Sequence, residues 1–209
     1  YSNDSLLWQK PIDGTAIFPP SVADVDGDGD VEIALLTGGA PFNGRTYLVD
    51  HEGNDLPGWP LNFDNNWMAN APVLVDVNGD EILEMIACEI DGAAGNVHIL
   101  QLDGTPFGEN WPVALPGRPA VTPSVGDVDG DGQMEIVAFT TQAQFVFELD
   151  GAVVDGWPID DTATKFSYQS PILRDLDNSG KLQIIGATHG DAPEYYIRNA
   201  DGSYYSNWP

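Results

Sequence analysis

The chain has 209 residues, enough for one sizeable domain or two small ones, and its 33 acidic against 7 basic side chains give a formal net charge of −26. This balance excludes nucleic acid and anionic membrane surfaces as partners, because both require basic patches. No apolar run long enough to insert into a membrane and no leader motif stand out. Because the sequence begins within a segment that looks folded, we expect either a removed leader or a piece of a longer protein. The single cysteine, Cys88, lies in an apolar run and is predicted to be buried and unreactive.

The segment 5–13 is the first predicted element. It combines Trp8 and Pro11 with apolar residues. The same combination returns later as a Trp-Pro pair, at Trp59, Trp111, Trp157 and Trp208. We therefore predict that 5–13 is a strand of the same kind as those that close the later repeats.

An acidic loop follows at 24–32, with the sequence Asp-Val-Asp-Gly-Asp-Gly-Asp-Val-Glu. It places acidic side chains at loop positions 1, 3, 5 and 9 and glycine at positions 4 and 6. A hard cation such as Ca²⁺ takes about six to eight oxygen ligands, which alternate residues of a tightly curled loop can supply. Because the like charges in such a short segment repel each other without a cation, the sequence predicts a calcium loop rather than a metal-free acidic turn.

An EF-hand is the nearest alternative to this loop. It requires a bidentate Glu at position 12, where this chain has Leu35 and the near-copy of the loop at 127–135 has Ala138. The short apolar runs after the two loops are partly β-branched and lack helical periodicity. The sequence therefore predicts a calcium loop that leads into a strand.

Two further loops depart from this pattern. The second, 76–84, has Glu81 in place of the glycine at position 6, from which we expect backbone strain. The fourth, 175–183, keeps only two carboxylates and carries Lys181, so we expect Ca²⁺ at three sites and a weak or empty fourth. With a backbone carbonyl at position 7, the predicted ligands are Asp24, Asp26, Asp28, Asp30 and Glu32; Asp76, Asn78, Asp80, Ile82 and Glu84; Asp127, Asp129, Asp131, Gln133 and Glu135; and Asp175, Asp177, Ser179, Lys181 and Gln183.

The loops recur about every 50 residues, each after a proline and before a glycine-containing turn and a Trp-Pro pair. Each repeat reads as four short strands; in the third these are 123–127, 134–141, 144–149 and a last strand that carries Trp157-Pro158. No segment shows helical periodicity over three turns. The chain is therefore predicted to be all-β.

Repeated four-stranded units of this length are typical of a β-propeller. The predicted blades cover approximately 14–62, 63–114, 115–160 and 161–209, with 5–13 as a strand of a preceding blade. The tryptophans that recur once per repeat are expected to pack between blades. A β-sandwich is the alternative, although a sandwich does not require a repeat in both motif and length.

The loops 24–32 and 127–135, each preceded by Pro-Ser-Val and followed by an apolar run, resemble the FG-GAP or VCBS repeats of integrin-α-like β-propellers. The resemblance implies Ca²⁺ bound between the first two strands of a blade, in an extracellular or cell-surface protein. Propellers of this family usually have seven or eight blades. We therefore expect half of a larger ring, completed by self-association or by further blades outside this chain.

Two classes of function stay open. The first is a non-catalytic calcium-binding module for adhesion, ligand binding or assembly, with an extracellular protein or glycan as its partner. The second is part of a secreted polysaccharide-degrading enzyme, a lyase or hydrolase. Whether the chain is an enzyme is left open; no catalytic constellation stands out, so we favour the first class and assign no catalytic residue. Trp67, which lies outside the repeat register, and Arg45, in an irregular segment, are the candidate ligand-binding residues.

Overall fold

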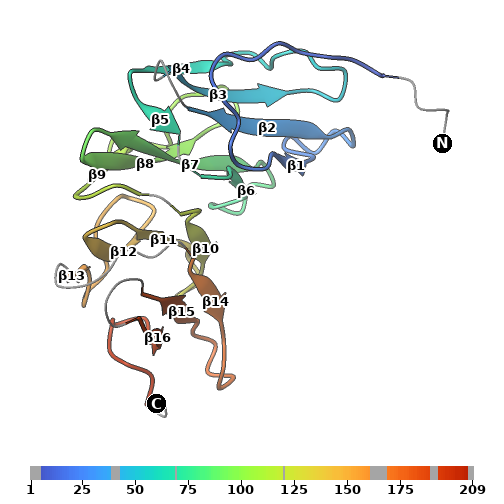
Figure 1. Cartoon of the computed structure of the whole chain (residues 1–209). Coiled ribbons are helices and arrows are strands. Elements are labelled where there is room, and N and C mark those ends of the chain that lie inside the picture. The colour runs from blue at the N-terminus through green and yellow to red at the C-terminus, as the bar shows by residue number, and fades with distance from the viewer. Residues whose placement is uncertain are drawn as a thin grey trace.

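The computed structural model describes residues 6–38, 43–68, 70–119, 121–160, 169–188 and 193–206. These residues form four antiparallel sheets and contain no helix, which confirms the all-β prediction. Figure 1 shows the sheets following one another in chain order, from the first at the top to the fourth at the bottom.

Each sheet is built mainly from strands that are neighbours in the sequence. The first sheet runs β1 (Ser21–Ala23), β2 (Glu32–Thr37), β3 (Asn43–Val49), β4 (Leu61–Asp64). The second runs β6 (Val73–Val75), β7 (Glu84–Asp91), β8 (Ala94–Leu100), β9 (Val113–Leu115), with β5 (Trp67–Met68) also paired to β7. The third runs β10 (Ser124–Gly126), β11 (Glu135–Phe139), β12 (Ala143–Phe147), β13 (Ile159–Asp160). The fourth runs β14 (Ile172–Arg174), β15 (Gln183–Ala187), β16 (Tyr195–Arg198).

The core lies between consecutive sheets, because the middle strands are buried on both faces. Side chains alternate between the two faces of a strand. On β7, Met85 and Ala87 pack with residues of the first sheet, whereas Ile86 and Cys88 pack with residues of the third. A third cluster joins the third and fourth sheets. This double burial explains why the central strands read as continuous apolar runs rather than as an alternating pattern.

Cys88 is buried, as predicted. It is fully enclosed in the cluster between the second and third sheets. Burial raises the pKa of its thiol to about 12, which keeps it protonated at neutral pH.

The repeated tryptophans attach each sheet to the next one. Trp59 donates its indole Nε1–H to the carbonyl of Leu102 at 2.8 Å. Trp111 and Trp157 make the same bond to later hairpins, at 2.7 Å in both cases, accepted by Leu149 and Ala200. All three acceptors directly precede the aspartate of an Asp-Gly turn. The prediction that these tryptophans pack between blades is confirmed, and the hydrogen bond adds a directional contact from one sheet to the next.

Glycine lets the chain approach the neighbouring hairpin closely. A Cβ at Gly58, which precedes Trp59, would lie 2.0 Å from the carbonyl oxygen of Asp103. In the second repeat the corresponding residue is Asn110, whose side chain instead donates to the carbonyl of Asp150 at 2.7 Å. Consecutive sheets are thus joined at the same place by two different contacts, a close approach of glycine in the first repeat and a hydrogen bond from asparagine in the second.

Residues 6–13 take part in no strand ladder within the described chain. Trp8 nevertheless donates to the carbonyl of His51 at 2.9 Å, in the hairpin of the first sheet, and its ring lies against Gly53. Trp8 therefore contacts the first sheet as Trp59 contacts the second.

The Trp-Pro pairs do not lie inside the last strand of a sheet as predicted, but directly before it: β13 begins at Ile159, after Trp157-Pro158. The predicted closing pair Trp208-Pro209 lies outside the described residues.

Candidate metal centres in the acidic loops

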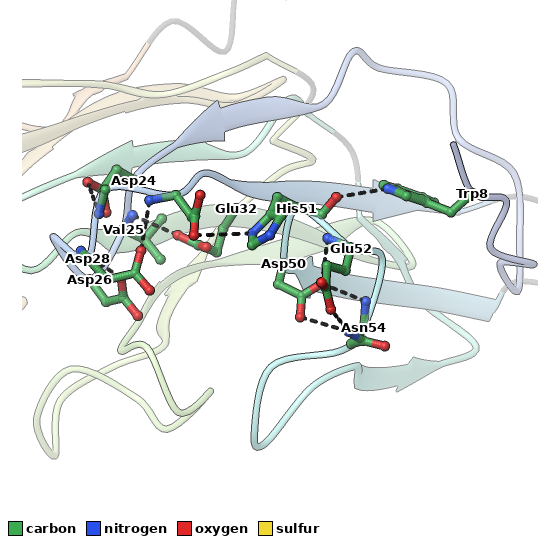
Figure 2. A network of polar contacts seen from close by, with 12 residues as sticks. Trp8, Asp24, Val25, Asp26, Asp28, Glu32, Asp50, His51, Glu52 and Asn54 are labelled. Carbon is green, nitrogen blue, oxygen red and sulfur yellow. Dashed lines mark hydrogen bonds and ion pairs between the residues drawn. The ribbon is translucent and has the colours of Figure 1, made fainter. Parts of the chain in front are cut away.

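The four acidic loops connect the first two strands of each sheet. In the first sheet, β1 pairs with β2 so that Ala23 lies opposite Glu32, and the intervening residues form the curl of the loop. The other sheets repeat this register, with Gly126 opposite Glu135 in the third. The loops therefore lie at the same strand ends as the turns between the third and fourth strands. Figure 2 shows the first loop beside the turn that contains Asp50 and His51.

The aspartate at loop position 1 organises each curl. Asp24 accepts the backbone N–H groups of Gly27 and Gly29, at 2.8 and 3.0 Å, one with each carboxylate oxygen. Asp127 does the same in the third loop at 2.7 and 3.0 Å. The side chain at position 5 then accepts the N–H of position 7, as Asp28 does from Asp30 at 2.8 Å. The backbone of the loop is thus shaped by its own carboxylates.

Positions 4 and 6 both require a left-handed backbone. The first loop has glycine at both, with φ of 74° at Gly27 and 96° at Gly29. Two positions depart from glycine: Glu81 at position 6 of the second loop has φ of 71°, and Asn178 at position 4 of the fourth has φ of 58°. Asparagine tolerates this region better than other residues with a Cβ. The strain predicted at Glu81 is therefore confirmed.

Replacing Glu81 by glycine should stabilise the protein. A side chain held in the left-handed region costs about 1–2 kcal/mol, whereas glycine adopts this region freely, although it loses more entropy on folding. We expect Glu81→Gly to raise the free energy of unfolding by about 1 kcal/mol, measured by urea denaturation. Gly29→Ala, the reverse change at the equivalent position, should destabilise; a loss of stability in Glu81→Gly would contradict the assignment of strain.

The residue at position 9 has a structural role that the sequence did not reveal. Glu32 accepts the backbone N–H of Val25, at loop position 2, with its Oε2 at 3.0 Å (Figure 2). Glu135 does so from Val128 at 2.6 Å, and Gln183 from Leu176 at 2.7 Å. One oxygen of position 9 thus ties the end of the loop to its start. A glutamine serves this purpose as well as a glutamate, so the pattern of acids alone could not have distinguished this bond from metal ligation.

The second carboxylate oxygen of Glu135 provides the test of whether a cation fits. The side chain is 1% exposed, and its Oε1 is buried without a hydrogen-bond partner among the described residues. Burial, with smaller contributions from Asp129 and Glu148, raises the pKa of Glu135 to about 7, against a bond from Val128 that lowers it. A buried carboxylate oxygen with no donor is poorly satisfied by the protein alone. It matches the chemistry of a cation ligand.

Acidic groups converge in two of the loops. Carboxylate oxygens of Asp24, Asp26 and Glu32 lie within 4.8 Å of one another, and so do those of Asp127, Asp129 and Glu135. These residues are the predicted ligands at positions 1, 3 and 9, whereas the aspartate at position 5 is not part of either group. Either cluster could therefore hold a metal ion. Burial also raises the pKa of Glu32 and of Glu84, despite the backbone bond that each accepts.

The second and fourth loops offer weaker donor sets. In the second, the Asn78 amide donates to Asp80 at 3.0 Å, so one oxygen of this carboxylate already accepts a hydrogen bond within the loop. In the fourth, position 9 is Gln183, whose amide donates to the carbonyl of Lys181 at 3.4 Å. That carbonyl belongs to position 7, the predicted backbone ligand. The side chain at position 9 of the fourth loop therefore closes the loop on itself by a hydrogen bond to position 7, whereas the other three loops have a carboxylate at position 9.

The two predicted ligand-binding residues lie on neighbouring strands, β3 and β5, which are in contact. Arg45, on β3, forms an ion pair with Asp13 at 2.8 Å and also donates to Asn62. Trp67, on β5, pairs in the ladder with Ile90 and lines a pocket.

Sequence reasoning did not find Glu148, which precedes the turn beside the third loop. Burial and then the charges of Asp129 and Asp131 raise the pKa of this carboxyl. Its place could not be found from spacing, because it belongs to another hairpin.

Comparisons with known proteins agree with this architecture. Residues 76–138 match the model of the FG-GAP-like repeat. The crystal structure of the V. cholerae biofilm matrix protein Bap1 is similar at a TM-score of 0.63 and 22% identity, over 88% of this chain and 27% of that chain. The quinohemoprotein alcohol dehydrogenase of Comamonas testosteroni is similar at a TM-score of 0.54 and 13% identity, over 87% of this chain and 34% of that chain.

This chain therefore spans about a quarter of the length of Bap1 and about a third of that of the dehydrogenase. No curated protein sequence matches it. None of the described residues belongs to a helix long and apolar enough to cross a membrane. The segment 76–138 matches the FG-GAP-like repeat, and the four sheets have the blade arrangement of a β-propeller rather than that of a sandwich.

Proposed function

We propose that this chain is a non-catalytic, calcium-binding propeller module of an extracellular or cell-surface protein, and that it binds an extracellular protein or glycan. The observation that carries the proposal is the buried, unpartnered Oε1 of Glu135 beside Asp127 and Asp129. Carboxylate and backbone carbonyl oxygens are the ligands that Ca²⁺ prefers, in flexible shells of about six to eight oxygens. The same donors at positions 1, 3 and 9 of the first loop, and the weaker set of the second, give three sites.

The extracellular location rests on the kind of loop and on the repeat. Short, solvent-exposed calcium loops of extracellular modules bind in the range of about 10⁻⁴–10⁻³ M, which only extracellular calcium saturates. The FG-GAP-like match supports the same location. Adhesion or assembly is the role that an acidic, calcium-stabilised scaffold without an assigned catalytic group fits best.

Exposed apolar side chains on the first and fourth sheets support a further part of this proposal, namely that other blades pack against them. On β1, Ala23 packs with the core, so Val22 points to the opposite face and is 58% exposed. On β14 and β16, the neighbours of the core residues Leu173 and Tyr196 are Ile172 and Tyr195, which are 61% and 66% exposed. Apolar side chains on outward sheet faces are suited to packing against a further sheet. Completion of the ring by a second copy or by further blades stays a prediction.

The test is binding on an array of glycans and extracellular proteins, in millimolar Ca²⁺ and in excess chelator. We expect binding that requires Ca²⁺, with no release of product from any polysaccharide. Trp67→Ala and Arg45→Ala are expected to weaken it, with the melting temperature of each variant measured because Arg45 also pairs with Asp13. Release of oligosaccharides by the isolated chain would favour the alternative, a polysaccharide lyase or hydrolase. Absence of binding in Ca²⁺, or equal binding in chelator, would contradict the proposal.

A further inference from the structure

A pocket of 380 Å³ lies at the strand ends opposite the calcium loops. It is built from the segment between β4 and β7, the turn between β7 and β8, and the segment that follows β9. Its lining residues are Asn65, Trp67, Ile90, Gly92 and Arg118. The acidic loops connect the first and second strands, whereas these segments enter or leave the other ends of the strands, so the pocket and the candidate metal centres do not compete for one ligand.

Trp67 provides a fixed apolar wall. β5 holds it opposite Ile90 in the ladder, and its ring packs against Gly38, where a Cβ would lie 3.2 Å from the indole Cγ. The indole is half-buried and also lines the pocket. An aromatic ring held in this way presents a large rigid surface at low entropic cost on binding.

The base of this wall is fixed by a buried polar network. Asn66, between Asn65 and Trp67, donates its side-chain amide to Glu89 at 2.5 Å. Glu89 also accepts from Asn96 at 2.8 Å and bonds the ring Nε2 of His98 at 2.9 Å. Because alternate residues of a strand face opposite ways, Glu89 lies behind the sheet surface to which Ile90 contributes. The wall of the pocket is therefore positioned before any ligand arrives.

Arg118 is the only cation among the described residues that line the pocket. Its Nε–H donates to the carbonyl of Gly92 at 2.6 Å, and its backbone is tied to Thr141 by bonds in both directions, each of 3.0 Å. The side chain is exposed, and within the described ranges no carboxylate forms an ion pair with it. Arg45 and Lys10, in contrast, are already paired with Asp13 and Asp55. The guanidinium is thus oriented, with its terminal N–H groups open to a ligand.

We propose that this pocket binds a saccharide residue that carries a carboxylate; this rests on the proposed function and names the class of ligand. A guanidinium whose two terminal NH₂ groups are open matches a carboxylate in charge and geometry, and the indole face suits the apolar C–H face of a sugar ring. The volume is at the small end of the range of about 300–1,000 Å³ for ligand pockets, so it suits one or two sugar units.

The net charge of the chain strengthens this specificity. With a net charge of −26, most of the surface repels an anionic sugar. This repulsion is screened beyond about 8 Å at physiological ionic strength, whereas a direct contact with Arg118 is not. An acidic saccharide is therefore expected to bind where a positioned cation faces an aromatic wall, and neutral sugars gain only the contact with the indole.

The test compares a short uronate oligosaccharide, digalacturonate, with its methyl ester by calorimetric titration in Ca²⁺. We expect the acid to bind at least tenfold more tightly than the ester. Arg118→Gln should remove this difference and leave binding of the ester unchanged, whereas Trp67→Ala should weaken both. Arg174→Gln is the matched control, because it removes the same charge from an exposed site on β14. Folding of each variant is checked by its melting temperature.

Equal affinity for acid and ester, or full retention of binding in Arg118→Gln, would overturn the assignment. The two proposals fail separately. If calcium-dependent binding on the array persists while digalacturonate does not bind, the pocket assignment is wrong and the module function stands. If digalacturonate binds through Arg118 but no array component is bound in a calcium-dependent manner, the pocket is correct and the proposed function is wrong.

Discussion

Removal of Ca²⁺ by a chelator is expected to lower the melting temperature of this protein strongly and reversibly. A cation at 100 times its dissociation constant stabilises the fold by about 2.7 kcal/mol per site, and in a domain of this size each kcal/mol corresponds to about 2–4 °C. Two or three occupied loops therefore correspond to about 10–30 °C. Differential scanning calorimetry in chelator and in about 10–100 mM Ca²⁺, which is about 100 times the dissociation constants expected of these loops, measures the shift. An unchanged melting curve in excess chelator would contradict calcium binding by the fold.

The effect of a loop substitution on stabilisation by Ca²⁺ should depend on how many oxygen donors that loop offers. Asp127→Ala removes both the acceptor of Gly130 and Gly132 and a carboxylate of the converging cluster, so it should abolish most of the stabilisation by Ca²⁺ at the third loop. Asp175→Ala removes a similar backbone acceptor from a loop that closes on itself. Its effect should be nearly the same with and without Ca²⁺. Equal dependence on Ca²⁺ in the two variants would contradict the ranking.

Glu135→Gln separates the metal role of position 9 from its structural role. Gln183 shows within this chain that glutamine keeps the bond to loop position 2. Burial raises the pKa of Glu135 in the folded state to about 7, so in chelator its ionised form destabilises the fold increasingly as the pH rises from about 4.5 to about 7. The variant should therefore melt higher than the wild type in chelator at pH 7.5, and lower in Ca²⁺. A variant that melts lower under both conditions would contradict this account.

The second large effect is a loss of folding stability at acidic pH that arises from Glu89. This carboxylate is 6% exposed; burial alone would raise its pKa, but hydrogen bonds from His98, Asn66 and Asn96 outweigh burial and lower the pKa to about 2. A depressed pKa in the folded state stabilises the protein above the unfolded-state pKa of about 4.5. This contribution is lost as the pH falls from about 4.5 to about 2.

Between pH 6 and pH 3 the loss at this one group should be about 2 kcal/mol. Because the acidic loops contain many other carboxylates, the measurement is the difference in unfolding free energy between wild type and Glu89→Gln, obtained from urea denaturation at each pH. The stabilities of the two proteins should converge as the pH falls. If both lose stability in parallel down to pH 3, the network does not hold Glu89 in its charged form.

The parts of this protein that follow from local spacing could be predicted from the sequence. The loops repeat a fixed pattern of acids and glycines, and the tryptophans mark each repeat, so strands, blades and candidate ligands could be assigned. Contacts between distant residues could not. Asn66, Glu89 and His98 meet only because β5 pairs with β7 and β7 with β8, and β5 has only two residues. The ion pair of Arg45 and the position of Arg118 depend on segments far away in the chain.

The hydrogen bonds from each indole to the next hairpin also determine how the sheets depend on one another. Trp111, at the end of the second sheet, is fixed by a carbonyl of the third, and Trp157, at the end of the third, by a carbonyl of the fourth. A sheet therefore completes its own outer edge only when its successor has folded. Nearest-neighbour coupling of this kind makes the interface between sheets, rather than the single sheet, the smallest stable unit. A cut between two sheets would damage the upstream fragment more, since it alone loses the acceptor for its last tryptophan.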